Sequence, residues 1–105
     1  MEHFYNKLVR DNIPSIISND GKSCDIEYIE SDEMMEYYLL MKIIEEINEL
    51  FKDKTIGEIA DVLEVLLSIG KLYGFTEEEI LKERKIKKEK NGGFDNRIVL
   101  WKVYE

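Results

Sequence analysis

Two pairs of acidic residues in the middle of the sequence have a spacing that suits chemistry on phosphates. Glu46 and Glu49 are three residues apart, and Glu58 and Asp61 repeat that spacing. On an α-helix, residues three apart point to the same side, so each pair presents two carboxylates together. Carboxylate oxygens suit Mg²⁺ or Mn²⁺, and magnesium keeps waters that phosphate oxygens can displace. The spacing therefore favours a divalent cation that holds a nucleotide's phosphates.

Two helices must position these acids. Ser31 is an N-cap candidate, and apolar residues then recur at helical spacing to about residue 52. Thr55 can cap a second helix that runs to Tyr73. Because the link is short, the two helices are antiparallel neighbours, and the acid pairs face each other near the turn.

The rest of the chain is mainly helical, with a minor β element. "TEEE" at 76–79 is a capping box that opens a third helix to about Lys90, and a short helix restarts at Pro14. Segments 25–30 and 97–103 are rich in β-branched and aromatic residues, so we expect a two-stranded β appendage.

The second helix is apolar nearly all round, which predicts that it is covered on two sides and that the chain self-associates. Four unpaired carboxylates beside it would be costly to bury, so a cation is expected there. The acids could instead form a solvated face, and Glu58 could complete a capping box with Thr55. Asp61 argues against this, because a mid-helix Asp has poor propensity and no cap to serve. A di-iron site is excluded, since His3 is the only histidine.

Composition bounds the class of protein. The 105 residues, 44% apolar and 36% charged, predict one domain over residues 1–105. There is no apolar run long enough for a membrane span, no signal-peptide pattern and a single cysteine, Cys24, so we expect a cytoplasmic protein. The net charge of −8 argues against binding a nucleic acid, whose backbone needs many Lys and Arg contacts.

Four sequence blocks together resemble a known group of enzymes. These are "EEINE" at 45–49, "EIAD" at 58–61, "YNKLVRDNIP" at 5–14 and "GGFDNRIVL" at 92–100, and "ADVLEVL" at 60–66 adds to them. The chain resembles the MazG-like and phosphoribosyl-ATP pyrophosphohydrolase superfamily of all-α enzymes. Within it, the chain is similar to the compact house-cleaning branch, which hydrolyses noncanonical nucleotides.

The resemblance implies an all-α bundle of the four-helix type that assembles as a homo-oligomer, a dimer or a tetramer. It implies Mg²⁺, with Mn²⁺ as a substitute, bound by Glu46, Glu49, Glu58 and Asp61. The implied reaction cleaves a nucleoside triphosphate between the α- and β-phosphates and yields a nucleoside monophosphate and pyrophosphate. Asn12 and Gly57 depart from the branch's pattern, as does the short link between the acid pairs, which leaves substrate preference open.

Further residues are candidates for catalysis and substrate binding. Glu45 lies one residue off the metal face and is our candidate for orienting or deprotonating the attacking water. Arg can fork onto two phosphate oxygens, whereas Lys acts as a point charge. The candidates for substrate binding are Lys7, Arg10, Lys42, Arg84, Gly93 and Arg97.

Each of these candidates has a structural alternative. Arg10 could pair with Asp11, and Arg97 with Asp95. A plain helix C-cap is an equal explanation of Gly93. The tyrosines Tyr37 and Tyr38 are expected in the core or at a subunit interface rather than against a base. For the whole chain, the alternatives are a non-catalytic helical dimerisation or partner-binding module and a phosphoribosyl-ATP pyrophosphohydrolase.

Overall fold

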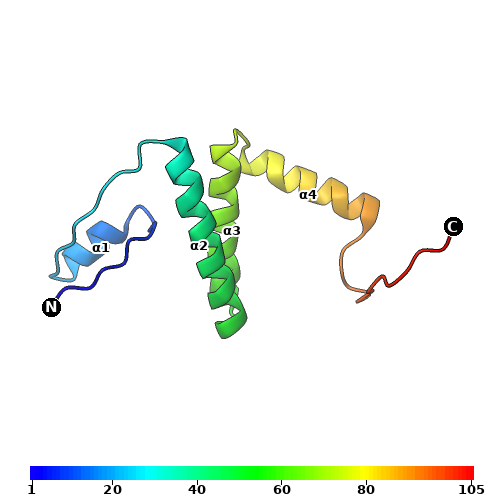
Figure 1. Ribbon diagram of the computed structural model, residues 1–105, viewed down its shortest axis with the longest axis horizontal. Coiled ribbons are helices and arrows are strands. Elements are labelled where there is room, and N and C mark those ends of the chain that lie inside the picture. The colour runs from blue at the N-terminus through cyan, green and yellow to red at the C-terminus, as the bar shows by residue number, and fades with distance from the viewer.

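The computed structural model describes residues 1–105 and contains four helices and no strands (Figure 1). They are α1 (Ile13–Asn19), α2 (Asp32–Asp53), α3 (Ile56–Leu72) and α4 (Glu77–Asn91). Helices α2 and α3 lie side by side as a hairpin at the centre (Figure 1). The N-terminal segment with α1 lies on one side of the hairpin, and α4 leads away on the other (Figure 1). The molecule is elongated, with extents of 63 × 31 × 23 Å.

The three longer helices begin at the caps that the sequence predicts. The Ser31 hydroxyl accepts a hydrogen bond from the Met34 amide, and the Thr55 hydroxyl accepts one from the Glu58 amide. At α4 the capping box is complete, because Thr76 and Glu79 each accept the other's backbone N–H. The bond from the Thr76 backbone lowers the pKa of Glu79.

A very short turn joins the two central helices. Lys54 has a left-handed backbone (φ 55°), and its N–H donates to the Leu50 carbonyl at 2.8 Å. The next residue, Thr55, already caps α3. The end of α2 and the start of α3 therefore lie together, as predicted.

The core of the single chain is small. Only Leu39 of α2 and Val65 of α3 are buried apolar side chains. On α3, the stripe through Val62, Val65, Ile69 and Leu72 is buried or half-buried, whereas the stripe through Ile59, Leu63 and Leu66 is exposed. The second helix is thus covered on one side by its own chain, not on two. No helix combines the length and the apolar content that crossing a membrane requires.

A glycine sets the corner between α3 and α4. Gly70 is buried, and a β-carbon added there would collide with the side chain of Ile80 on α4. The Gly70 carbonyl also accepts the Phe75 amide at 2.8 Å, which closes the turn. This close approach brings α4 against the end of α3.

The predicted β appendage is wrong. Residues 25–30 and 97–103 lie outside the helices and belong to no strand, and Arg97 has a left-handed backbone (φ 57°). Pairing needs two segments at hydrogen-bonding distance, but α4 carries the C-terminal segment to the opposite end of the molecule (Figure 1). β-propensity describes how residues fit a sheet once a partner strand is present.

We expect Gly70→Val to destabilise the protein by about 1–3 kcal/mol, because the added methyl groups overpack the contact with Ile80. Urea unfolding at fixed protein concentration measures this change. Gly57→Ala is the matched control: its β-carbon would meet only the Thr55 hydroxyl, at 3.8 Å, so it should stabilise by roughly 0.5–1 kcal/mol. Equal stability of Gly70→Val and wild type would contradict this account of the corner.

Candidate functional site

The acid pairs of α2 and α3 converge beside the turn of the hairpin. Glu46, Glu58 and Asp61 each offer a carboxylate oxygen within 4.8 Å of the others, and all three side chains are half-buried. Glu49, Asp53 and Glu58 form a second group that meets the same distance limit. Because Glu58 belongs to both groups, we call these five residues the carboxylate cluster.

Asp53 is the member of the cluster that our sequence-based selection of site residues missed. It is exposed, and it lies four residues after Glu49, on the last turn of α2. Its helical spacing from Glu49 places both residues on one side of α2, and this is the signal that could have identified it.

Glu58 is the carboxylate that is crowded most by like charges. The Thr55 hydroxyl accepts its amide N–H, but Glu58 returns no bond, so it does not complete a capping box. Partial burial, followed by the negative charges of Asp61, Asp53, Glu46 and Glu49, raises its pKa. The Glu58 side chain forms no ion pair with any residue of the chain.

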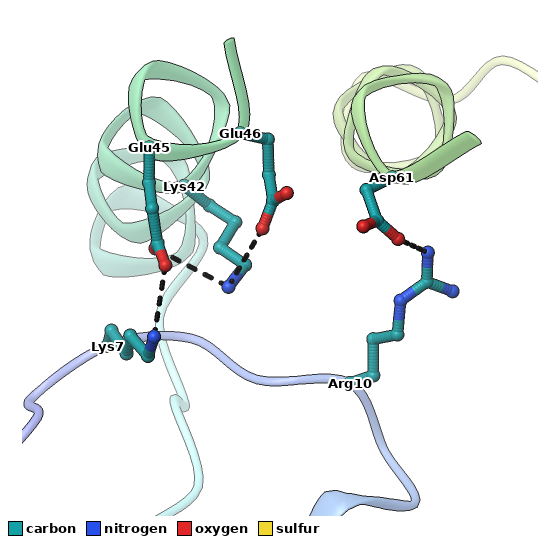
Figure 2. A network of polar contacts seen from close by, with 6 residues as sticks. All are labelled: Lys7, Arg10, Lys42, Glu45, Glu46 and Asp61. Atoms are coloured by element: carbon teal, nitrogen blue, oxygen red, sulfur yellow. Dashed lines mark hydrogen bonds and ion pairs between the residues drawn. The ribbon is translucent and has the colours of Figure 1, made fainter. Parts of the chain in front are cut away.

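Lys42 lies on α2 and neutralises part of the negative charge of the acidic residues on that helix. Its ammonium lies 3.4 Å from a carboxylate oxygen of Glu45 and 3.4 Å from one of Glu46 (Figure 2). Only 14% of the Lys42 side chain is exposed. The predicted substrate-binding residue Lys42 is therefore an internal counter-ion of the site in this structure.

The N-terminal segment supplies two further cations. It passes beneath the hairpin, with Lys7 directed at α2 and Arg10 at α3 (Figure 2). Lys7 donates to Glu45 at 3.0 Å, and Arg10 donates to Asp61 at 2.7 Å. Arg10 therefore pairs with a predicted metal ligand rather than with its neighbour Asp11. Both pairs are partly exposed, and such pairs typically contribute less than about 1 kcal/mol each, so a ligand can displace them.

Glu45 differs from the cluster residues because cations surround it. Burial by itself would raise its pKa, but the hydrogen bond from Lys7 and the charges of Lys42 and Lys7 outweigh burial and lower the pKa overall. Glu45 is thus held as a carboxylate at the edge of the cluster, where it can accept a proton or a hydrogen bond from water.

The other predicted substrate-binding residues lie elsewhere in the single chain. Arg84 is on α4, and Gly93 and Arg97 follow α4. The carboxylate cluster is near the start of α3, whereas α4 follows the other end of α3 (Figure 1). At 1.5 Å per helical residue, Asp61 and Leu72 are roughly 16 Å apart along the axis. The chain's own fold does not bring these three residues to the cluster, and Arg97 forms no ion pair with Asp95.

Comparison with known proteins gives the family. The model of the family described as dUTPase matches residues 3–96 of this chain. The chain therefore belongs to the dUTPase family, and it is a nucleotide pyrophosphohydrolase. Enzymes of this kind generally use a divalent cation such as Mg²⁺. No curated protein and no solved structure matches the chain.

This match corrects the family that the motifs suggested. The resemblance to the MazG-like and phosphoribosyl-ATP pyrophosphohydrolase superfamily was wrong, because the matching family is dUTPase. The physical reason is that paired carboxylates at helical spacing meet a general need of metal-assisted phosphate chemistry. They point to the reaction more directly than to the family. Membership of an enzyme family also removes the non-catalytic alternative.

We expect Lys42→Met to raise the pKa of Glu45, because the charge and the hydrogen bond of Lys42 help to lower it. A carbon-13 NMR titration of the side-chain carboxyls, without added metal, measures the shift. Lys87→Met on α4 removes the same charge away from the cluster and should leave the Glu45 titration unchanged. An unchanged Glu45 titration in Lys42→Met would rule out Lys42 as the counter-ion.

Proposed function

We propose that this enzyme hydrolyses dUTP between the α- and β-phosphates, with Mg²⁺ held by Glu46, Glu49, Glu58 and Asp61. Mn²⁺ is a suitable substitute. The observation that carries this proposal is that carboxylate oxygens from α2 and α3 lie within 4.8 Å of one another in two groups that share Glu58, in a chain of the dUTPase family. The products would be dUMP and pyrophosphate. Removing dUTP is a house-cleaning reaction, because it eliminates a nucleotide whose base does not belong in DNA.

The residues present fit a hard divalent cation. The donors are all carboxylate oxygens, the set that Mg²⁺ and Mn²⁺ prefer. Partial burial, followed by the negative charges of the neighbouring acids, raises the pKa of Glu58, and the Glu58 carboxylate pairs with no cation of the chain. A dication at this position would relieve that repulsion.

The chain's own residues divide the chemistry between them. When bound, the metal offsets the charge that develops on the leaving pyrophosphate and lowers the pKa of a coordinated water. Glu45 would orient the attacking water and accept its proton, because its carboxylate lies at the edge of the cluster and shares the Lys42 ammonium with Glu46. The water oxygen bonds to the α- or the β-phosphorus, and the bond between that phosphorus and the bridging oxygen breaks. The two products, dUMP and pyrophosphate, then separate.

Lys7 and Arg10 would neutralise the phosphates. Without substrate they pair with Glu45 and Asp61. If Asp61 held the cation, Arg10 would be released from Asp61, and its fork geometry matches two phosphate oxygens. The N-terminal segment thereby changes partners from carboxylates to phosphates when metal and nucleotide bind.

We expect Asp61→Asn and Glu49→Gln to lose roughly a hundredfold or more of the dUTP hydrolysis rate, since even residues that only orient metal ligands cost ten- to a hundredfold. Pyrophosphate release with Mg²⁺ measures the rate, and circular dichroism verifies the helices. Asp20→Asn is the matched control, because Asp20 pairs only with Lys22 beyond α1. Full activity in either cluster variant would end the metal proposal.

A homodimer would account for the apolar surface of the single chain. The accessible area is 10129 Å², whereas a compact chain of 12.5 kDa exposes only about 6,200 Å². If each of two copies lost this excess of roughly 3,900 Å², the dimer would bury about 7,800 Å² in total, which is above the roughly 2,000–5,000 Å² that most obligate interfaces bury and is ample for a stable dimer. Exposed apolar stripes on α2 (Leu40, Ile44, Ile47, Phe51) and on α3 (Ile59, Leu63, Leu66) run along the hairpin. We propose that a second copy covers these stripes and completes a four-helix bundle over the single domain of residues 1–105.

The dimer also gives a role to the predicted residues that lie far from the cluster. Arg84, Gly93 and Arg97 would reach substrate only at the site of a neighbouring copy, since their own chain carries them away from the cluster. In a dimer, α4 and the segment after it would extend across the partner. This arrangement is part of the dimer proposal.

Leu63→Lys should convert the dimer to a monomer and reduce its stability, because the substitution places a charge in the apolar stripe. Sedimentation velocity over a range of concentrations gives the mass. Ile16→Lys on α1 is the control, since Ile16 is exposed outside the stripes and should leave the mass unchanged. A monomeric wild-type protein would contradict the proposal.

A further inference from the structure

A cavity lies beside the carboxylate cluster, between the N-terminal segment and α2. Its volume is about 170 Å³, and residues 6–8 of the segment form one wall. Tyr37, Tyr38 and Met41 of α2 form the apolar part of the opposite wall. None of these residues belongs to the carboxylate cluster, and the chemistry described above uses none of the α2 wall.

The cavity opens directly onto the proposed phosphate site. Lys42 and Glu45 line its polar end. The Lys42 ammonium lies 3.4 Å from Glu45, inside the cavity lining, and 3.4 Å from Glu46, inside the cluster. Lys7, which also lines the cavity, donates to Glu45 at 3.0 Å. A molecule in the cavity therefore has its charged end beside the metal-binding carboxylates.

The apolar wall suits a flat aromatic ring. Tyr37 and Tyr38 meet edge to face, with ring centroids 5.6 Å apart. Tyr37 and Met41 are both more than 40% exposed, so their side chains are open to a ligand. Aromatic rings and Met sulfur are favourable surfaces against the face of a nucleobase. The prediction that both tyrosines lie in the core or at a subunit interface stays a prediction, since Tyr37 is exposed in the single chain and also lines this cavity.

Asn6 supplies directed polar groups at the same place. Its backbone is left-handed (φ 46°), a conformation that non-glycine residues adopt uncommonly and that Asn tolerates best. The Tyr38 hydroxyl donates to the Asn6 side-chain oxygen at 3.1 Å. With its oxygen engaged in this way, the Asn6 amide directs its N–H donors elsewhere, and these donors bond to no group of the chain.

We propose that this cavity binds the nucleobase of the substrate and that Asn6 donates a hydrogen bond to a ring carbonyl oxygen. The inference rests on the proposed function, because it uses the phosphate site as the anchor. The donor discriminates if it faces O4 of uracil, because cytosine carries its exocyclic amine, also a donor, at that position, whereas both bases carry the O2 carbonyl. Discrimination follows because the wrong base leaves polar groups unpaired in the complex. Tyr38 is the positioning residue that sets the orientation of the amide.

Calorimetry with Mg²⁺ and the nonhydrolysable α,β-imido forms of dUTP and dCTP tests the assignment. Wild type should bind the dUTP analogue more tightly than the dCTP analogue. Asn6→Gly keeps the left-handed backbone while it removes the amide, and we expect a roughly tenfold loss of affinity for the dUTP analogue alone. Tyr38→Phe should lose part of the same preference, because it frees the amide to rotate. Asn19→Gly, at the exposed end of α1, is the matched control and should bind as wild type does.

The outcomes separate this inference from the proposed function. An equal loss of affinity for both analogues in Asn6→Gly would show that Asn6 only holds the N-terminal segment, and the base-reading role would be overturned. Retained base preference in Asn6→Gly overturns it as well. Selective binding of the dUTP analogue by a wild-type protein that does not cleave dUTP would overturn the proposed hydrolysis and leave the base site standing. Absence of binding by wild type would overturn both.

Discussion

The position of the N-terminal part of the molecule depends on the negative charges that crowd together between α2 and α3. The five carboxylates of the cluster lie near the turn that joins α2 to α3. Three cationic side chains of the same chain form ion pairs with acidic residues at this end of the hairpin. One of these cations, Lys42, comes from α2 itself. The other two come from the N-terminal segment. This segment lies across the hairpin because Lys7 pairs with Glu45 and Arg10 pairs with Asp61. Helix α1 packs against no other helix, so ion pairs and the Asn6–Tyr38 bond hold this part of the chain in place.

Such ion pairs are weak when they are exposed, and that weakness has a use. A buried, well-packed N-terminal segment would resist displacement, whereas partly exposed ion pairs exchange at little cost. In the proposed enzyme, the same segment would carry the two cations for the phosphates and the amide for the base. Recognition of both ends of the substrate would then rest on residues 6–10. The helices hold the carboxylates in place, whereas the N-terminal segment can exchange its ion pairs.

The apolar surface imposes a second condition. A chain with only Leu39 and Val65 as buried apolar side chains has a small core for its length. The α3 stripe through Ile59, Leu63 and Leu66 lies on the face that its own α2 leaves open. Self-association would bury this stripe and place the carboxylate clusters of two copies in one bundle. Stability and function would then depend on the same pair of helices.

The sequence by itself determined the helices and the acids that they carry. Ser31, Thr55 and Thr76 cap helices where capping chemistry predicts, and the spacing of the acids together with the short turn placed both pairs at one end of the hairpin. These features are local, because a cap or a helical face depends on residues within a few positions. Only the tertiary structure decided the partner of Arg10, the cavity beside Tyr37 and the unpaired state of segments 25–30 and 97–103. Arg10 and Asp61 are 51 residues apart, and no spacing rule reaches that far. Contacts of this kind depend on how whole elements are placed, which the charge and packing of the folded chain decide.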